Sequence, residues 1–151
     1  MALTDLQGHR GPTQRVRIER GPVRVFAAAL LDDDPVYDGD DAPVPPTFPF
    51  VMPYWGSLGS GGAAGLPIER LRGPGRMILH GEQAFTYHRW PRVGDELEGT
   101  PVVTQVYERE RSGGGRLEFY VQETDWRDAR SGDPVVTSTF TLVVNVRPDA
   151  A

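Results

Sequence analysis

The last part of the chain alternates between apolar and polar residues, which is the pattern of a β-strand with one buried face. Val136, Ser138, Phe140, Leu142, Val144 and Val146 alternate with Thr137, Thr139, Thr141 and Asn145. Three further strands are predicted before it, over residues 77–89, 97–111 and 116–127, and the run Ser112–Gly115 predicts a hairpin turn between the last two. The second half of the chain therefore predicts four long antiparallel strands.

The first half predicts one short strand at Val16 and Ile18 and one amphipathic helix. The apolar stripe of this helix consists of Val23, Phe26, Ala27, Leu30 and Leu31, and Asp34-Pro35 ends it. A helix with such a stripe and a sheet with one apolar face must each be covered, and a sheet that wraps around the helix covers both. We therefore expect an α+β hot-dog fold, an antiparallel sheet wrapped around a central apolar helix.

The remaining segments complete the expected domain. Residues 1–14 are polar and glycine-containing and are expected to form a flexible N-terminal arm. Residues 15–148 are expected to form a single domain, with a long loop at 43–76 that is rich in Pro and Gly. The aromatic residues in this loop predict that it packs on the domain.

Composition excludes several classes of function. The chain of 151 residues has no Cys, and all sixteen of its basic residues are Arg, so disulfides, thiolate zinc sites and lysine Schiff-base chemistry are excluded. Its net charge of −5 argues against nucleic-acid and membrane-surface partners. Three scattered His give no metal signal. With no signal-peptide pattern and no apolar run of membrane-spanning length, we expect a cytoplasmic protein.

Several short segments, in order along the chain, resemble the MaoC-like hydratases and dehydratases of the hot-dog superfamily. They are FAAAL at 26–30, DDDPVY at 32–37, PPTFP at 45–49, LHGEQ at 79–83, YHR at 87–89 and VGD at 93–95, followed by the closing strand from Ser138 to Val144. Together they extend over nearly the whole chain after residue 15. The chain looks most like the stand-alone N-terminal-type domain, in particular the non-catalytic-type subunit of two-component (3R)-hydroxyacyl-ACP dehydratases.

The resemblance implies a reaction centre on a Gly-Asp-x-Asn-Pro-aliphatic-His segment, in which the Asp and the His share one water or one substrate proton. In this sequence the Gly position is Leu31, the Asp is Asp32, the Asn position is Asp34, the Pro is Pro35 and the His position is Tyr37. A tyrosine, with a reference pKa of ~10, is a poor base at neutral pH. The catalytic His that the resemblance implies is thus replaced by Tyr37.

The resemblance therefore implies an accessory or degenerate subunit that shapes the acyl groove of a (3R)-hydroxyacyl-thioester dehydratase or enoyl-thioester hydratase, a hydro-lyase. The expected ligand is an acyl-CoA or acyl-ACP thioester of fatty acid or polyketide metabolism, without a cofactor. The expected partner is a hot-dog subunit, in a homodimer or in a heterodimer with a catalytic subunit. Two alternatives stay open: a self-sufficient homodimeric enzyme for an unusual acyl thioester, and a non-catalytic acyl-thioester-binding or scaffold protein.

The candidate catalytic residues are Asp32, Tyr37 and His80. The alternative for the aspartates is a turn in which they bond the local backbone. His80 and Glu82 are two residues apart and are expected to share a strand face, either as a substitute acid/base pair or as a structural pair. The candidate substrate-binding residues are Asp34, Pro46, Phe48, Phe50, Tyr54, Trp55 and Glu82; the alternative for the aromatic ones is the core.

Overall fold

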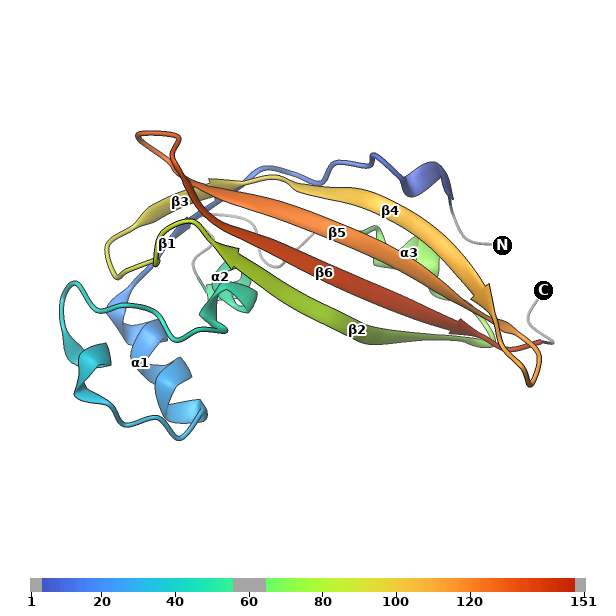
Figure 1. Ribbon diagram of the computed structural model, residues 1–151, viewed down its shortest axis with the longest axis horizontal. Helices are drawn as coiled ribbons and strands as arrows, with labels where there is room; N and C mark the ends of the chain where they lie inside the picture. The colour runs from blue at the N-terminus through green and yellow to red at the C-terminus, as the bar shows by residue number, and fades with distance from the viewer. Residues whose placement is uncertain (1–3, 56–64, 149–151) are drawn as a thin grey trace.

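The computed structural model describes residues 4–55 and 65–148, and its main feature is one antiparallel sheet. Figure 1 shows four long strands side by side, which are β4 (Pro101–Glu110), β5 (Arg116–Asp128), β6 (Pro134–Val146) and β2 (Arg76–Tyr87). Two short strands, β1 (Gln14–Arg17) and β3 (Glu96–Gly99), extend the sheet beside β5. All predicted strands are therefore present, and the second is divided into β3 and β4 at Thr100.

The helical segments are short. They are α1 (Arg20–Ala29), α2 (Met52–Trp55) and α3 (Ile68–Leu71), together with the 3₁₀ turns η1 (Thr4–Leu6), η2 (Pro35–Asp38) and η3 (Phe48–Phe50). Part of the predicted loop at 43–76 is thus helical, and residues 56–64 of that loop lie outside the described residues. Within the described residues, no helix has the length and apolar character needed to cross a membrane.

The inner face of the sheet carries two apolar clusters. The first lies at the α1 end and contains Val16, Ile18, Val23, Val44, Phe48, Met52, Leu97, Trp126, Val135 and Val136. The second lies at the other end and contains Leu6, Leu66, Leu71, Val103, Tyr120, Leu142, Val144 and Val146. Val136, Leu142, Val144 and Val146 are buried, so the predicted inner face of β6 is correct.

The amphipathic helix does not lie centrally along the sheet as expected. α1 lies beyond one end of the long strands (Figure 1), and only Val23 and Ala27 of it are buried. Leu30 and Leu31, which belong to the predicted apolar stripe, are exposed because the helix ends at Ala29. The inner face is covered instead by η3 and α2 through Phe48 and Met52, and by the α3 region at the other end.

The described part of the expected flexible arm is paired with the sheet. The backbone N–H of Gly8 donates to the carbonyl of Val103 at 2.8 Å, and the N–H of Gly11 donates to the carbonyl of Pro101 at 2.9 Å. Leu6 is completely buried in the second cluster. Residues 6–11 therefore belong to the domain, because they cover part of the β4 edge and supply a core side chain.

Candidate functional site

A groove of about 290 Å³ opens on the inner face of the sheet, between the two apolar clusters. Its lining includes Trp126 from the first cluster and Leu66 and Leu142 from the second. Between these side chains the sheet contributes mostly polar residues. The groove is thus a cavity with apolar ends and a polar middle.

Aromatic rings form one wall of the groove around His80. The imidazole lies 5.4 Å from the ring of Phe50 and 4.8 Å from the ring of Phe140, edge-on to the latter. Phe50 in turn lies 6.3 Å from Tyr54, which also lines the groove. His80 therefore faces the groove in an aromatic setting.

A β-bulge at Gly81 decides which residues join His80. His80 pairs with Leu142 of β6, whereas Glu82 pairs with the adjacent Thr141, so His80 and Glu82 point to opposite faces of the sheet. The expectation that they share a face is therefore wrong. A Cβ on Gly81 would lie 2.5 Å from Cγ2 of Val143, so the bulge as built leaves no room for a side chain at this position.

Gln83 takes the inner position that was expected for Glu82. Its Nε2 donates to Oγ of Ser138 at 3.0 Å and to the carbonyl of Thr139 at 3.1 Å. Both Gln83 and Ser138 line the groove.

β5 completes the polar middle of the groove, because here its polar residues face inward and several of its apolar residues face outward. The even-numbered residues from Glu118 to Trp126 face inward and include Gln122 and Thr124, which line the groove. The apolar residues Leu117, Phe119 and Val121 face outward. Sequence reasoning missed Gln14, Gln83, Gln122, Thr124 and Ser138 as groove residues. The available signal was Ser138, a polar residue in the predicted apolar row of β6.

The segment that resembles the family's reaction centre lies in a second, open depression of about 480 Å³ at the end of α1. Its lining is acidic and includes Asp32, Asp33, Asp34, Tyr37 and Asp38. Asp38 is paired with Arg24 at 2.9 Å. No three His, Asp or Glu side chains in the described part of the chain gather closely enough to hold a metal ion.

A Schellman turn ends α1 at this acidic depression. The N–H of Asp32 donates to the carbonyl of Ala27 and that of Leu31 to the carbonyl of Ala28, both at 3.0 Å. Leu31 takes the left-handed position of the turn, with a φ of 59°, and its side chain is 93% exposed. The Gly of the family segment maps to this position, where glycine would be free of backbone strain.

The aspartates of the depression bond the local backbone. An Oδ1 of Asp32 accepts from the N–H of Asp34 at 3.2 Å, and an Oδ1 of Asp34 accepts from the N–H of Val36 at 2.9 Å and caps η2. This is the turn arrangement that the sequence left open as the alternative. Both carboxylates therefore have a structural role, whatever their part in chemistry.

Tyr37 is held in its protonated form. Burial raises the pKa of its phenol, and the neighbouring charge and hydrogen bond of Asp32 raise the pKa further. The phenol can donate a hydrogen bond at neutral pH, but it cannot serve as a base there.

The structure divides the predicted catalytic residues between the two cavities. Asp32 and Tyr37 line the acidic depression, whereas His80 lines the groove. The predicted trio is therefore not assembled into one constellation in this chain.

The predicted substrate-binding residues are also divided. Phe50 and Tyr54 line the groove, but Phe48 is buried in the core against Phe26, with ring centroids 5.5 Å apart. Pro46 is exposed, and its carbonyl accepts a hydrogen bond from the hydroxyl of Tyr87. Asp34 lies in the depression and Glu82 on the outer face, while the side chain of Trp55 lies outside the described residues.

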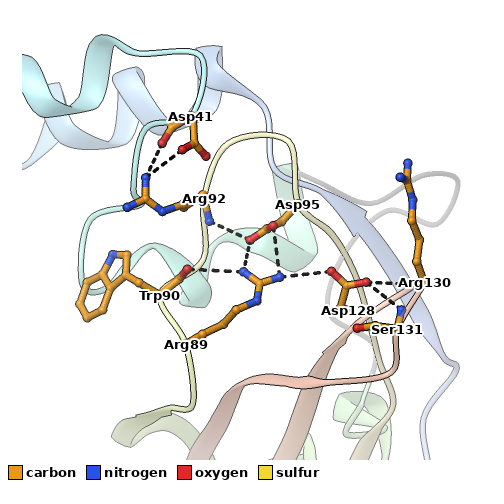
Figure 2. A network of polar contacts seen from close by, with 8 residues as sticks. All are labelled: Asp41, Arg89, Trp90, Arg92, Asp95, Asp128, Arg130 and Ser131. Atoms are coloured by element: carbon orange, nitrogen blue, oxygen red, sulfur yellow. Dashed lines mark hydrogen bonds and ion pairs between the residues drawn. The ribbon is translucent and has the colours of Figure 1, made fainter.

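Two other segments of the resemblance form a structural clasp. Figure 2 shows the Arg89 guanidinium between Asp95 and Asp128, at 2.6 Å from Asp95 and 3.2 Å from Asp128. The Asp128 carboxylate also accepts from the backbone N–H groups of Arg130 and Ser131. The YHR and VGD segments therefore join the end of β2 to the start of β3 and to the β5–β6 turn.

Residues 5–138 match the family model of the FAS1-like dehydratase domain region. Among curated proteins, a UPF0336 protein of Leifsonia xyli subsp. xyli is 32% identical in an alignment of length 144 that covers 88% of this chain and 88% of that protein. Both matches extend over most of the chain and place it in this family.

Solved structures share the fold at low identity. A chain of the ChsH1-ChsH2 complex from Mycobacterium tuberculosis has a TM-score of 0.69 at 15% identity, over 94% of this chain and 86% of that one. A chain of the HadBC (3R-hydroxyacyl-ACP dehydratase) complex from the same organism has a TM-score of 0.64 at 20% identity, over 91% and 98%. The MaoC-like dehydratase from Rhodospirillum rubrum has a TM-score of 0.60 at 20% identity, over 98% and 99%.

These matches confirm the hot-dog fold class, with α1 displaced to one end of the sheet. The chain belongs to the FAS1-like dehydratase family, and its structural neighbours include MaoC-like hot-dog dehydratases.

Proposed function

We propose that this chain is the accessory subunit of a (3R)-hydroxyacyl-thioester dehydratase or enoyl-thioester hydratase. It would hold the acyl chain in the groove, while a hot-dog partner supplies the Asp and His that move protons. The observation that carries this proposal is Tyr37, a protonated phenol at the position where the family's segment has its catalytic His.

The chemistry explains why this substitution matters. Dehydration removes a proton from the carbon next to the thioester carbonyl and protonates the departing hydroxyl, and hydration reverses both transfers. Such transfers are fastest when the pKa of the catalytic group lies near the working pH. Tyr37 fails this requirement because its pKa is raised from an already high value, and His80 lies in the other cavity.

The free edge of β2 supports a hot-dog partner. β2 is twelve residues long and lies last in the strand order, with no further strand beside it among the described residues. The opposite side of the sheet is partly covered by residues 6–11. A long open edge is a site for pairing with another chain, and two of the structural neighbours were solved as complexes.

The test is co-expression with the open reading frames that neighbour its gene, followed by size analysis and an enoyl-thioester hydration assay. We expect a stable complex with a hot-dog protein that carries an intact Asp-x-Asn-Pro-x-His segment, and hydration by the complex. Hydration by the purified chain alone, with loss of activity in Asp32→Ala or His80→Ala, would instead establish the self-sufficient enzyme.

A further inference from the structure

We infer that the groove takes an acyl chain that carries oxygen substituents, such as keto or hydroxyl groups, in place of a plain hydrocarbon chain. This inference rests on the proposed acyl-binding role and names the substrate class of that same groove. It is carried by the polar middle of the groove.

Thr124 and Gln122 provide the first observation. Thr124 is only 6% exposed and lines the groove, as does Gln122. Within the described residues, neither the hydroxyl of Thr124 nor the amide of Gln122 has a hydrogen-bond partner in the protein, although every fully enclosed side-chain N or O atom there has one. Both groups are therefore open to the groove, where water or a bound ligand can supply their hydrogen-bond partners.

The packing of Gly65 provides the second observation. A Cβ on Gly65 would lie 1.8 Å from Oε1 of Gln122, so the absence of a side chain at this position makes room for the amide. Gly65 itself lines the groove. The Gln122 amide is thus seated by the backbone opposite it and is not a loose surface group.

The strand register spreads hydrogen-bonding groups across three strands. Gln122 of β5 pairs with Phe140 of β6, which pairs with Gln83 of β2, so the two amides flank one aromatic ring. Thr124 pairs with Ser138 in the adjacent row. Neighbouring strands lie about 4.8 Å apart, so these groups extend over roughly 10 Å of the groove floor.

The chemistry of these groups suits keto and hydroxyl substituents. An amide offers both N–H donors and a carbonyl acceptor, and a threonine hydroxyl offers one donor and an acceptor. A keto oxygen can accept from the Gln122 amide, and a hydroxyl can both donate and accept. A saturated chain in the same place would cover these groups without replacing their bonds to water, which is unfavourable.

The experiment compares two non-hydrolysable pantetheine thioethers by calorimetry, using the chain and its complex with the hot-dog partner. Both carry chains of equal length; one is saturated and the other has a single mid-chain keto group. Because one neutral hydrogen bond changes affinity by roughly twofold to tenfold, we expect the keto probe to bind about fivefold more tightly. In the variant Gln122→Leu/Thr124→Val this preference should disappear, with the saturated probe bound at least as tightly as before.

The matched control is Gln105→Leu/Thr139→Val, which removes an amide and a hydroxyl from the outer face of the same sheet. It should keep the preference for the keto probe, and unfolding curves of both variants check that each folds. Equal affinity for both probes, or tighter binding of the saturated one to the unaltered chain, would overturn the inference while leaving the acyl-binding role intact. Failure of both probes to bind the complex would overturn the acyl-binding role itself.

Discussion

The groove and the acidic depression are built differently. The groove is set in the sheet, its residues are fixed by strand register and by the bulge at Gly81, and buried clusters support it at both ends. The acidic depression is formed by a helix end and a single 3₁₀ turn, and its aspartates bond the local backbone. The position to which the resemblance assigns the catalytic His holds Tyr37, a protonated phenol.

Under the proposed function, this difference would separate substrate binding, which the chain supplies, from proton transfer, which its partner supplies. Proton transfer at neutral pH depends on one group with a suitable pKa, and a single substitution removes it. Binding depends on many side chains held in register, and the groove residues of this chain are held by the strand register. A groove set in the sheet, together with a tyrosine at the position of the family's His, is what the proposed accessory subunit requires.

The largest effect is expected at Glu118, which is hydrogen-bonded to Tyr120 of the second cluster. Glu118 is fully buried, and its carboxylate accepts from Arg76, Arg116 and Tyr120. Breaking a buried pair leaves charges uncompensated, so Glu118→Gln should lower the free energy of unfolding by about 3–5 kcal/mol at neutral pH. Glu108→Gln, at the exposed side of Arg116, is the control and should change it by about 0.5 kcal/mol or less.

The same carboxylate should make the free energy of unfolding depend on pH in the acidic range. Burial raises the pKa of Glu118, but hydrogen bonds from Arg76, Tyr120 and Arg116 outweigh this and hold the pKa below its usual value. The folded state then binds fewer protons than the unfolded state, so this stability is present above the ordinary glutamate pKa and is lost as pH falls through the lowered one. Denaturant titrations from neutral to acidic pH should show a weaker pH dependence in Glu118→Gln; an unchanged dependence would contradict the assignment.

The next effect is expected at the bulge that orients the groove wall. In Gly81→Ala the new Cβ would clash with Val143, and it would lie 3.1 Å from the carbonyl of Thr141. We expect a loss of about 1–3 kcal/mol in the free energy of unfolding, and weaker acyl binding as His80 and Gln83 shift. Gly113→Ala, where a Cβ meets nothing within 4 Å, should be nearly neutral; equal losses in both variants would show that the bulge is not tightly packed.

In the depression, Leu31→Gly should increase stability. A leucine in the left-handed conformation costs roughly 1–2 kcal/mol, and the greater freedom of glycine in the unfolded chain offsets part of the gain. We expect a net rise of about 0.5–1 kcal/mol in the free energy of unfolding, measured by urea titration. Leu30 has a φ of −85°, which suits any residue, so Leu30→Gly should not raise the free energy of unfolding. A gain in Leu30→Gly and none in Leu31→Gly would contradict the strained turn.

The smallest effect is expected at Tyr37 itself. If the phenol takes no part in proton transfer, Tyr37→Phe should leave the hydration rate of the complex within about twofold. Replacing the partner's catalytic His should lower the rate by about 10²–10⁴, the usual contribution of a general acid or base. A comparable loss in Tyr37→Phe would move the reaction into the acidic depression of this chain.

Periodicity predicted most of the fold correctly, because strands and the amphipathic helix each leave a local pattern. All the strands follow from it, and the turn between β4 and β5 follows from the Ser-Gly run at 112–115. The position of α1 and the pairing of residues 6–11 with β4 do not, because both depend on which surfaces remain uncovered once the sheet has formed.

The groove was harder to predict for a specific reason. A bulge inserts one residue and moves the following side chains to the other face, so Glu82 and Gln83 exchanged the expected positions. On β5, large apolar residues occur on both faces, with Phe119 outside and Tyr120 inside, so alternation alone does not reveal the inner face. The replacement at Tyr37, in contrast, was visible in the sequence, because finding it requires only the identity and order of the residues in the segment and not their positions in space.

The most direct measurement of the central claim is a titration of the purified catalytic partner with this chain, followed by the initial rate of enoyl-thioester hydration. The account predicts no hydration by this chain alone, and a rate that rises with added chain and levels off at an equimolar ratio. Hydration by this chain without the partner, abolished in Asp32→Ala, would contradict it.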